Sequence, residues 1–181
     1  MSSNELDQAK QMLAELDANS TRALVRAVNY AAVKARTLGA RLIRDEVKLP
    51  AAYVNARLKV DQRASATDPS AMISGRGRAT QLSRFGAKQL TTKAKLPGKR
   101  RLAGARVEVT PGRKKVLAGA WLMKQKGGNT GLMVRTGPNR NDYKPLYGPS
   151  IDQLWRNIRE QVAPEVSDLM LSEFIRQMEL T

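Results

Sequence analysis

The sequence predicts an α+β fold: a long N-terminal helix, an antiparallel β-sheet or meander with an extended basic arm, and C-terminal helices. Two observations predict it. Apolar residues recur at helical spacing near both ends of the chain, whereas in short segments between residues 57 and 136 charged and apolar residues alternate as in strands. The 181 residues suit one domain. Its expected parts are helix at 1–48, sheet at 57–136 with the arm at about 75–104, and helices at 150–179.

The N-terminal helix has the strongest periodic signal in the chain. From Thr21 to Val47 the apolar residues follow alternating steps of four and three. They are Leu24, Val28, Ala31, Ala35, Leu38 and Leu42. This spacing favours an amphipathic core helix over a coiled-coil partner helix. An earlier helix begins near Asn4, and the polar run Asn19-Ser20-Thr21 predicts a break between the two.

The next segments predict a short helix and two strands. Leu49-Pro50 ends the long helix, because the residue before proline avoids the α region, and residues 50–55 predict a helical turn. Residues 57–61 and 71–73 alternate as strands, with a turn at 67–70 between them. Residues 75–104 are poor in apolar side chains and predict a long loop or arm with one candidate strand at 81–85. A structureless loop of this length is uncommon in a compact domain, which indicates that it has a binding partner.

The second half of the chain predicts a meander followed by helices. Strands are expected at 106–109, 116–123 and 131–135, with turns at Pro111-Gly112 and near Gly127-Gly128. The second of these strands is expected to be buried. Ser150 and Gln153 form a capping box at the start of a helix. Pro164 predicts a kink or the start of a further helix.

Composition argues against catalysis. The chain has no Cys and no His. It therefore lacks disulfides, thiolate ligands, the commonest general base and the commonest metal ligand. The acids are scattered. We expect no enzyme activity, no catalytic residue, no cofactor and no metal. The N-terminus shows no secretory signal, and no uncharged stretch approaches the roughly 20 residues of a membrane helix. A soluble protein made in the cytoplasm, with no membrane partner, is expected.

Charge is the main functional signal. The net charge is +16, and residues 76–126 carry fifteen basic side chains and one acid, Glu108, a net +14. Such a field attracts a polyanion or an acidic protein surface. The candidate contacts are Arg76, Arg78, Lys99, Arg100, Arg101, Arg113, Lys114 and Lys115. A solvated loop that only aids solubility is the alternative.

Other motifs carry less weight. Residues 75–78 resemble one copy of an arginine–glycine RNA-binding segment, although a flexible basic loop is the favoured interpretation. Aromatic residues for stacking on bases are few, and Trp121 and Trp155 lie among apolar neighbours that favour a place in the core.

Several segments, in order, resemble the minor tail protein Z family of tailed bacteriophages and prophages. The early Ala-rich helix at 22–32 resembles that family's helix around an Ala-x-Asn-x-x-Ala core. Residues 56–60, 104–109 and 119–122 resemble its strands, with Trp121 in place of the usual phenylalanine. Residues 134–137 and 145–150 resemble its pore loop and the entry to its C-terminal helix.

This resemblance implies a structural virion protein of the tail or neck, made in the host cytoplasm. The family acts in tail completion and head–tail joining at the head-proximal end of the tail. The implied partners are further copies of the chain in a ring, with a hexamer favoured, and the neighbouring terminator, tube and connector proteins. DNA in the channel is a further partner that the charge suggests. The alternative is a bacterial nucleic-acid-binding protein that uses the basic arm.

Overall fold

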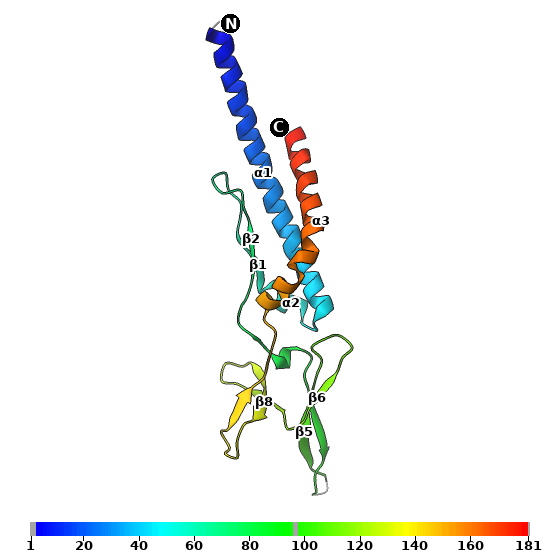
Figure 1. The fold of residues 1–181 in the computed structure, drawn as a ribbon. Helices are drawn as coiled ribbons and strands as arrows, with labels where there is room; N and C mark the ends of the chain where they lie inside the picture. The colour runs from blue at the N-terminus through cyan, green and yellow to red at the C-terminus, as the bar shows by residue number, and fades with distance from the viewer. Residues whose placement is uncertain (1–2, 96–97, 181) are drawn as a thin grey trace. The chain divides into compact units, whose positions relative to one another are not determined.

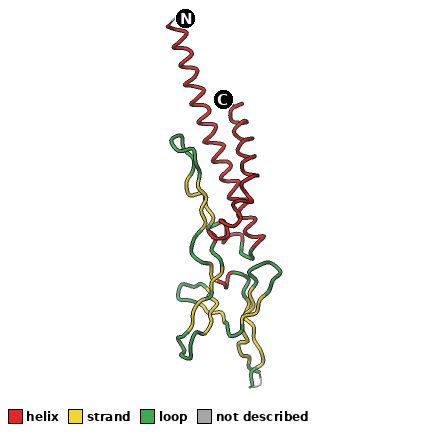
Figure 2. Tube along the Cα trace, viewed as in Figure 1, coloured by secondary structure: helices red, strands yellow, loops and turns green. Residues whose placement is uncertain are grey.

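The computed structural model describes residues 3–95 and 98–180, including their side chains except those of 3–14 and 16. The helices are α1 (Ser3–Glu46), α2 (Ala51–Asn55) and α3 (Ile151–Glu179), with a 3-10 helix η1 (Leu82–Arg84). The first strands are β1 (Leu58–Gln62), β2 (Met72–Gly75), β3 (Thr80–Gln81), β4 (Lys88–Lys93) and β5 (Arg100–Val107). The others are β6 (Lys115–Leu117), β7 (Trp121–Lys124), β8 (Thr130–Arg135), β9 (Tyr143–Pro145) and β10 (Tyr147–Gly148). The α+β class is confirmed (Figures 1 and 2).

The chain divides into two compact units. The helical unit comprises Met1–Gly39, Lys59–Ser74 and Ile158–Thr181. The sheet unit comprises Ala40–Leu58 and Gly75–Asn157. Helices α1 and α3 each contribute residues to both units.

An alanine stripe on α1 lies in the core of the helical unit, together with Ile158 and Val162 of α3. Ala23, Ala27, Ala31 and Ala35 recur every four residues and are buried. The larger residues expected on this face, such as Leu24 and Leu38, are only half-buried. Small side chains let neighbouring elements pack closely against the helix, which explains why the burial falls on the alanines.

Polar contacts connect α1 to its neighbours in the helical unit. The Asn29 side-chain amide donates to the carbonyl of Ala64 and accepts from its N–H, both at 3.0 Å. Arg26 donates to the Gln177 side chain on α3 at 3.1 Å. Gln177 and Arg176 in turn donate to Glu173. The bonds from Arg176 and then Gln177 lower the pKa of Glu173 to about 2.

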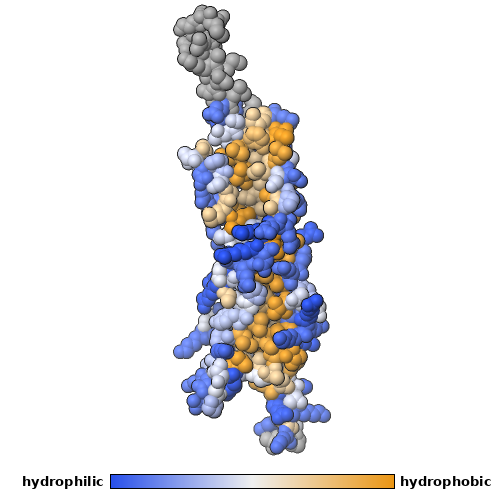
Figure 3. All heavy atoms as spheres, in the orientation of Figure 1, coloured by the Kyte–Doolittle hydropathy of each residue, from blue (hydrophilic) through white to orange (hydrophobic). Residues whose placement is uncertain are grey.

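Large apolar side chains remain exposed in the helical unit. Tyr30 and Val33 on α1 are 39% and 45% exposed, and Leu171 and Ile175 on α3 are 59% and 50% exposed. Figure 3 shows hydrophobic residues gathered over α1 and α3 on the face in view. Exposed apolar area of this kind is typical of an interaction surface.

The sheet unit holds two three-stranded antiparallel sheets, β4-β5-β6 and β7-β8-β9, and the pair β3–β10. One core cluster consists of Ala105, Val107, Ala120 and Leu132, with Leu82 and Leu122 packed against it. Phe85 is fully buried in this unit, as are Ile43 and Leu58. Core side chains therefore come from α1, the strands and the segment after η1.

The predicted break at residues 19–21 is wrong, because α1 is continuous through them. The Ser20 hydroxyl donates to the carbonyl of Asp17 at 2.9 Å, so this polar group is satisfied within the helix. The helical turn at α2 and the strands β1 and β2, which pair with each other, are confirmed. For the earlier helix expected near Asn4, the side chains of residues 3–14 and 16 lie outside the part that the structure describes.

The predicted loop at 75–104 is also wrong, because β4 and β5 pair there as an antiparallel hairpin. The polar residues of this segment did not indicate strands, because pairing between strands satisfies the backbone hydrogen-bonding groups even where apolar side chains are few. Gln89 secures the hairpin, since its side chain donates to the Gly104 carbonyl at 2.7 Å and accepts from the Leu122 N–H at 2.8 Å. Gly104, at φ +111°, lies at the bulge where the register shifts. The candidate strand at 81–85 is mostly η1.

The predicted single meander is divided between two sheets. Residues 116–123 do not form one buried strand, because Gly119, at φ +70°, turns the chain between β6 and β7. Strand β6 pairs with β5, whereas β7 pairs with β8. Ser150 caps α3 as predicted, accepting from the Gln153 N–H at 3.0 Å. Pro164 lies inside one continuous helix.

Candidate functional site

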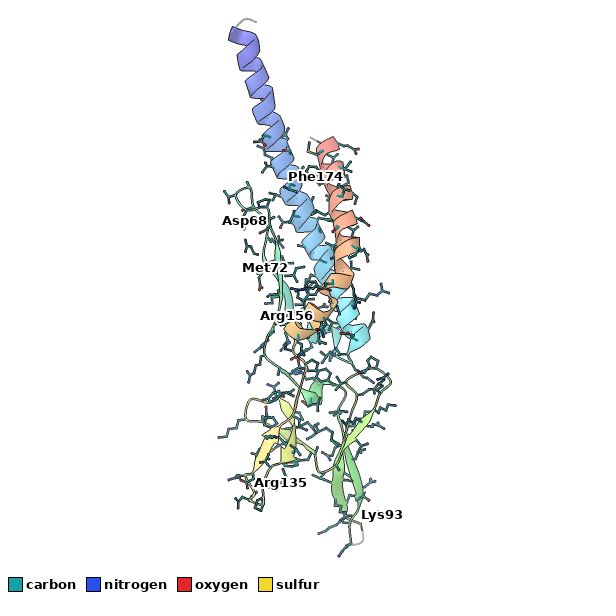
Figure 4. The ribbon with its side chains drawn as sticks, viewed as in Figure 1. Asp68, Met72, Lys93, Arg135, Arg156 and Phe174 are labelled. Atoms are coloured by element: carbon teal, nitrogen blue, oxygen red, sulfur yellow. The ribbon has the colours of Figure 1, made fainter. Side chains whose placement is uncertain are left out.

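The eight predicted contact residues lie in three separate places in the sheet unit. Lys99, Arg100 and Arg101 belong to the hairpin tip, which we define as the described residues 93–95 and 98–101. Arg100 pairs across the hairpin with Lys93, which Figure 4 labels near its end. Every basic side chain of the described tip is exposed, namely those of Lys93, Lys95, Lys99, Arg100 and Arg101. The described part of the tip therefore presents five cations and no acid.

Arg113, Lys114 and Lys115 lie at the other end of β5. Lys115 pairs with Val107, seven residues along the strand from Arg100. At about 3.3 Å per residue the two clusters are about 23 Å apart. A single small ligand therefore cannot contact both clusters.

Glu108 has a structural role beside this second cluster. Its carboxylate pairs with the Lys48 ammonium at 2.7 Å and accepts from the Gly112 N–H at 2.9 Å. These two bonds, from Lys48 first, lower the pKa of Glu108. The only acid among residues 76–126 thus holds the turn that carries Arg113 and Lys114.

Arg76 and Arg78 line a third place, which we call the arginine pocket. It is a cavity of about 190 Å³ lined by Arg57, Arg76, Arg78 and Arg84, with Tyr53 and Tyr147 beside them. These residues come from α2 and the residue before β1, from the loop after β2, from η1 and from β10. Sequence reasoning missed Arg57 and Arg84, because neither stands in a run of basic residues.

Stacking orders two of the four guanidinium groups in the arginine pocket, those of Arg57 and Arg84. The Cζ of Arg57 lies 3.7 Å from the centre of the Tyr53 ring, and that of Arg84 lies 4.8 Å from it. Arg84 also donates to the Asn129 side chain at 3.1 Å, and Arg57 donates to the Tyr53 carbonyl at 3.3 Å. The buried Arg57 Nε has no hydrogen-bond partner among the described residues.

An aromatic groove lies elsewhere in the sheet unit. Trp121, expected in the core, is only half-buried and lines an open groove of about 820 Å³ with Tyr143, Arg135 and Leu102. Its ring meets that of Tyr143 edge to face at 6.0 Å, and the Arg135 guanidinium lies 5.6 Å from its centre. Figure 4 labels Arg135 at the end of β8. Tryptophan, tyrosine and arginine are the residues enriched at protein interfaces.

The described residues offer neither a metal site nor a membrane-spanning helix. Among the side chains that the structure describes, no three acidic groups gather as a metal site would require. No helix in the described part of the chain combines the length and apolar character needed to span a membrane.

Comparison with known families identifies the chain. The family described as prophage minor tail protein Z (GPZ) matches residues 4–180. The chain belongs to this family. It is therefore a structural protein of a phage tail, and other tail proteins are its partners. Neither the curated proteins nor the solved structures contain a match to it.

Several segments that resemble the minor tail protein Z family have clear structural roles in this member. Asn29 of the Ala-rich helix fixes the loop after β1 through its paired bonds to Ala64. In the segment before α3, Gly148 packs against the Phe85 ring, and Ser150 caps the helix. These matching residues therefore support the fold, whereas the arginine pocket is formed largely by residues outside them.

Proposed function

We propose that this chain is a tail completion protein that forms a closed ring at the head-proximal end of the tail and joins the tail to a filled head. Membership of the minor tail protein Z family over residues 4–180 carries the proposal. A hexamer is favoured because tail tubes are generally built on sixfold rings. The terminator, tube and connector proteins are the expected neighbours.

The exposed apolar residues of the helical unit support assembly with further copies. Tyr30, Val33, Leu171 and Ile175 offer area that a neighbouring subunit can bury. A ring requires a heterologous interface, in which one surface of each copy meets a different surface of the next. We expect α1 or α3 to provide one of these surfaces.

Disruption of the gene in its phage or prophage is the direct test. Electron micrographs should show filled heads and separate tails, and supply of the protein from a plasmid should restore joined particles. Native mass spectrometry of the isolated tail end should detect a ring of this chain. Joined particles in the absence of the protein, or monomers alone at this place, would contradict the proposal.

A second candidate function is binding of DNA, favoured by the five exposed cations of the hairpin tip. Replacement of Lys99, Arg100 and Arg101 by Gln should weaken binding to a short DNA duplex. The slope of log affinity against log salt should fall by up to about 0.9 for each phosphate that the variant no longer neutralises. Folding should hardly change, because exposed charges contribute little to stability. An unchanged slope would assign the tip to solubility alone.

A further inference from the structure

We propose that the arginine pocket binds carboxylate side chains from an acidic segment of a neighbouring tail protein. The inference rests on the proposed function in one respect only, which is that tail assembly supplies a protein partner. Within the described residues, no carboxylate pairs with Arg57, Arg76, Arg78 or Arg84. Four guanidinium groups therefore surround one small cavity without a counter-charge from the described chain.

The walls of the arginine pocket are already ordered for an anion. Arg57 and Arg84 are stacked on Tyr53, and Arg84 is tied to Asn129. The Gln81 amide donates to the Gln125 side chain at 2.9 Å, which fixes a further wall. A guanidinium presents N–H donors in a planar fork that matches a carboxylate in two parallel bonds. Because the donors of Arg57 and Arg84 are held in advance, their binding to a carboxylate loses less side-chain entropy.

Backbone contacts fix the loop that carries Arg76 and Arg78. The Arg76 N–H donates to the Arg57 carbonyl at 2.9 Å, and its own carbonyl accepts from the Asp152 N–H at 3.3 Å. The loop therefore lies between the residue before β1 and the start of α3. This arrangement brings Arg57 beside Arg76 although they are nineteen positions apart in the chain.

The shape of the pocket favours a protein ligand over duplex DNA. A cavity of about 190 Å³ can admit one or two protruding side chains. Phosphates on a duplex lie on a continuous convex backbone, and exposed cations on a projecting element suit them better. The hairpin tip has that form. The side-chain amides of Gln81, Gln125 and Asn129 also provide both donors and acceptors, which a peptide backbone can use.

The test uses the full chain and a fluorescein-labelled hexaglutamate peptide, with affinity measured by fluorescence anisotropy. The triple variant R76Q/R78Q/R84Q should bind the peptide at least about tenfold more weakly, since it can no longer form charge-assisted bonds to the carboxylates. The matched control is K99Q/R100Q/R101Q, which removes the same charge from the hairpin tip. Its peptide affinity should fall by less than about threefold. An equal fall in peptide affinity in both variants would show that the peptide is attracted only by the general positive charge of the protein, and would overturn the inference.

Two further measurements keep the inference testable. Arg84 contacts Tyr53 and Asn129, so the triple variant is first checked for its unfolding midpoint. If it unfolds more readily, the variant R76K/R78K serves instead, because it keeps the charge and removes the planar fork. It should still weaken peptide binding severalfold, and unchanged binding would overturn the inference.

Binding of a short DNA duplex is also measured for both the pocket variant and the hairpin-tip variant. Loss of duplex binding in the pocket variant, with peptide binding intact, would assign the pocket to nucleic acid instead. The particle experiment is independent of this one. If the unaltered protein fails to bind the peptide but disruption of the gene still leaves heads and tails unjoined, the inference about the arginine pocket is overturned and the proposed function stands.

Discussion

Replacement of Phe85 by Ala should lower the free energy of unfolding by about 3–5 kcal/mol, the typical cost of removing a buried aromatic ring. Phe85 is 0% exposed. The backbone leaves little freedom to fill the cavity, because the Phe85 carbonyl accepts from the Glu108 N–H at 3.0 Å and its N–H donates to the Leu82 carbonyl at 3.2 Å. The total free energy of unfolding of a native protein is about 5–15 kcal/mol, so this loss would be a large fraction of it.

Urea unfolding followed by circular dichroism measures this loss. The control is Phe174→Ala, which removes the second of the two phenylalanines, a half-buried residue of α3 labelled in Figure 4. It should cost clearly less, because less apolar area is taken from water on folding. A Phe174 variant as unstable as the Phe85 variant would contradict the assignment of Phe85 to the core.

Replacement of Gly75 by Ala should lower the free energy of unfolding by about 1–3 kcal/mol, the usual cost of overpacking. A Cβ at Gly75 would lie 2.6 Å from the Asp152 nitrogen and 2.7 Å from its Cα. These are backbone atoms in the first turn of α3, so either the helix start or the loop must move. Because the loop continues into Arg76 and Arg78, the variant should also bind the hexaglutamate peptide more weakly.

Gly77→Ala is the matched control in the same Gly-Arg-Gly-Arg segment. A Cβ at Gly77 would meet nothing within 4 Å, and its φ lies outside the region that favours glycine. Its free energy of unfolding should change by no more than about 0.5 kcal/mol, as for an ordinary surface substitution. Equal stability of the two variants, measured by urea unfolding, would disprove the close approach of Gly75 to α3.

Local patterns in the sequence were sufficient for most of the helices and several strands. The spacing in α1, the proline before α2, the alternation in β1 and β2 and the cap at Ser150 each depend on residues a few positions apart. Such signals are read correctly because backbone propensity and amphipathic burial act over one or two turns. The order of the motifs also indicated the family, which the match over residues 4–180 confirms.

The polar strands show where local reading fails. Residues 88–93 contain two lysines, two threonines and one leucine, and so resemble a solvated loop. Their order comes from pairing with β5 and from the bonds of Gln89 to Gly104 and Leu122. The prediction for Trp121 was wrong for the opposite reason. Its apolar neighbours suggest burial, yet the turn at Gly119 places it in an open groove.

The sequence by itself determined the fold class, the family and the amount of positive charge, because these follow from composition and from patterns along the chain. Only the tertiary structure decided how that charge is distributed. It separates the hairpin tip from the turn at Arg113, pairs Glu108 with Lys48, and gathers Arg57 and Arg84 with Arg76 and Arg78. The physical reason is that these groups meet through packing between distant segments, which leaves no trace in the spacing of neighbouring residues.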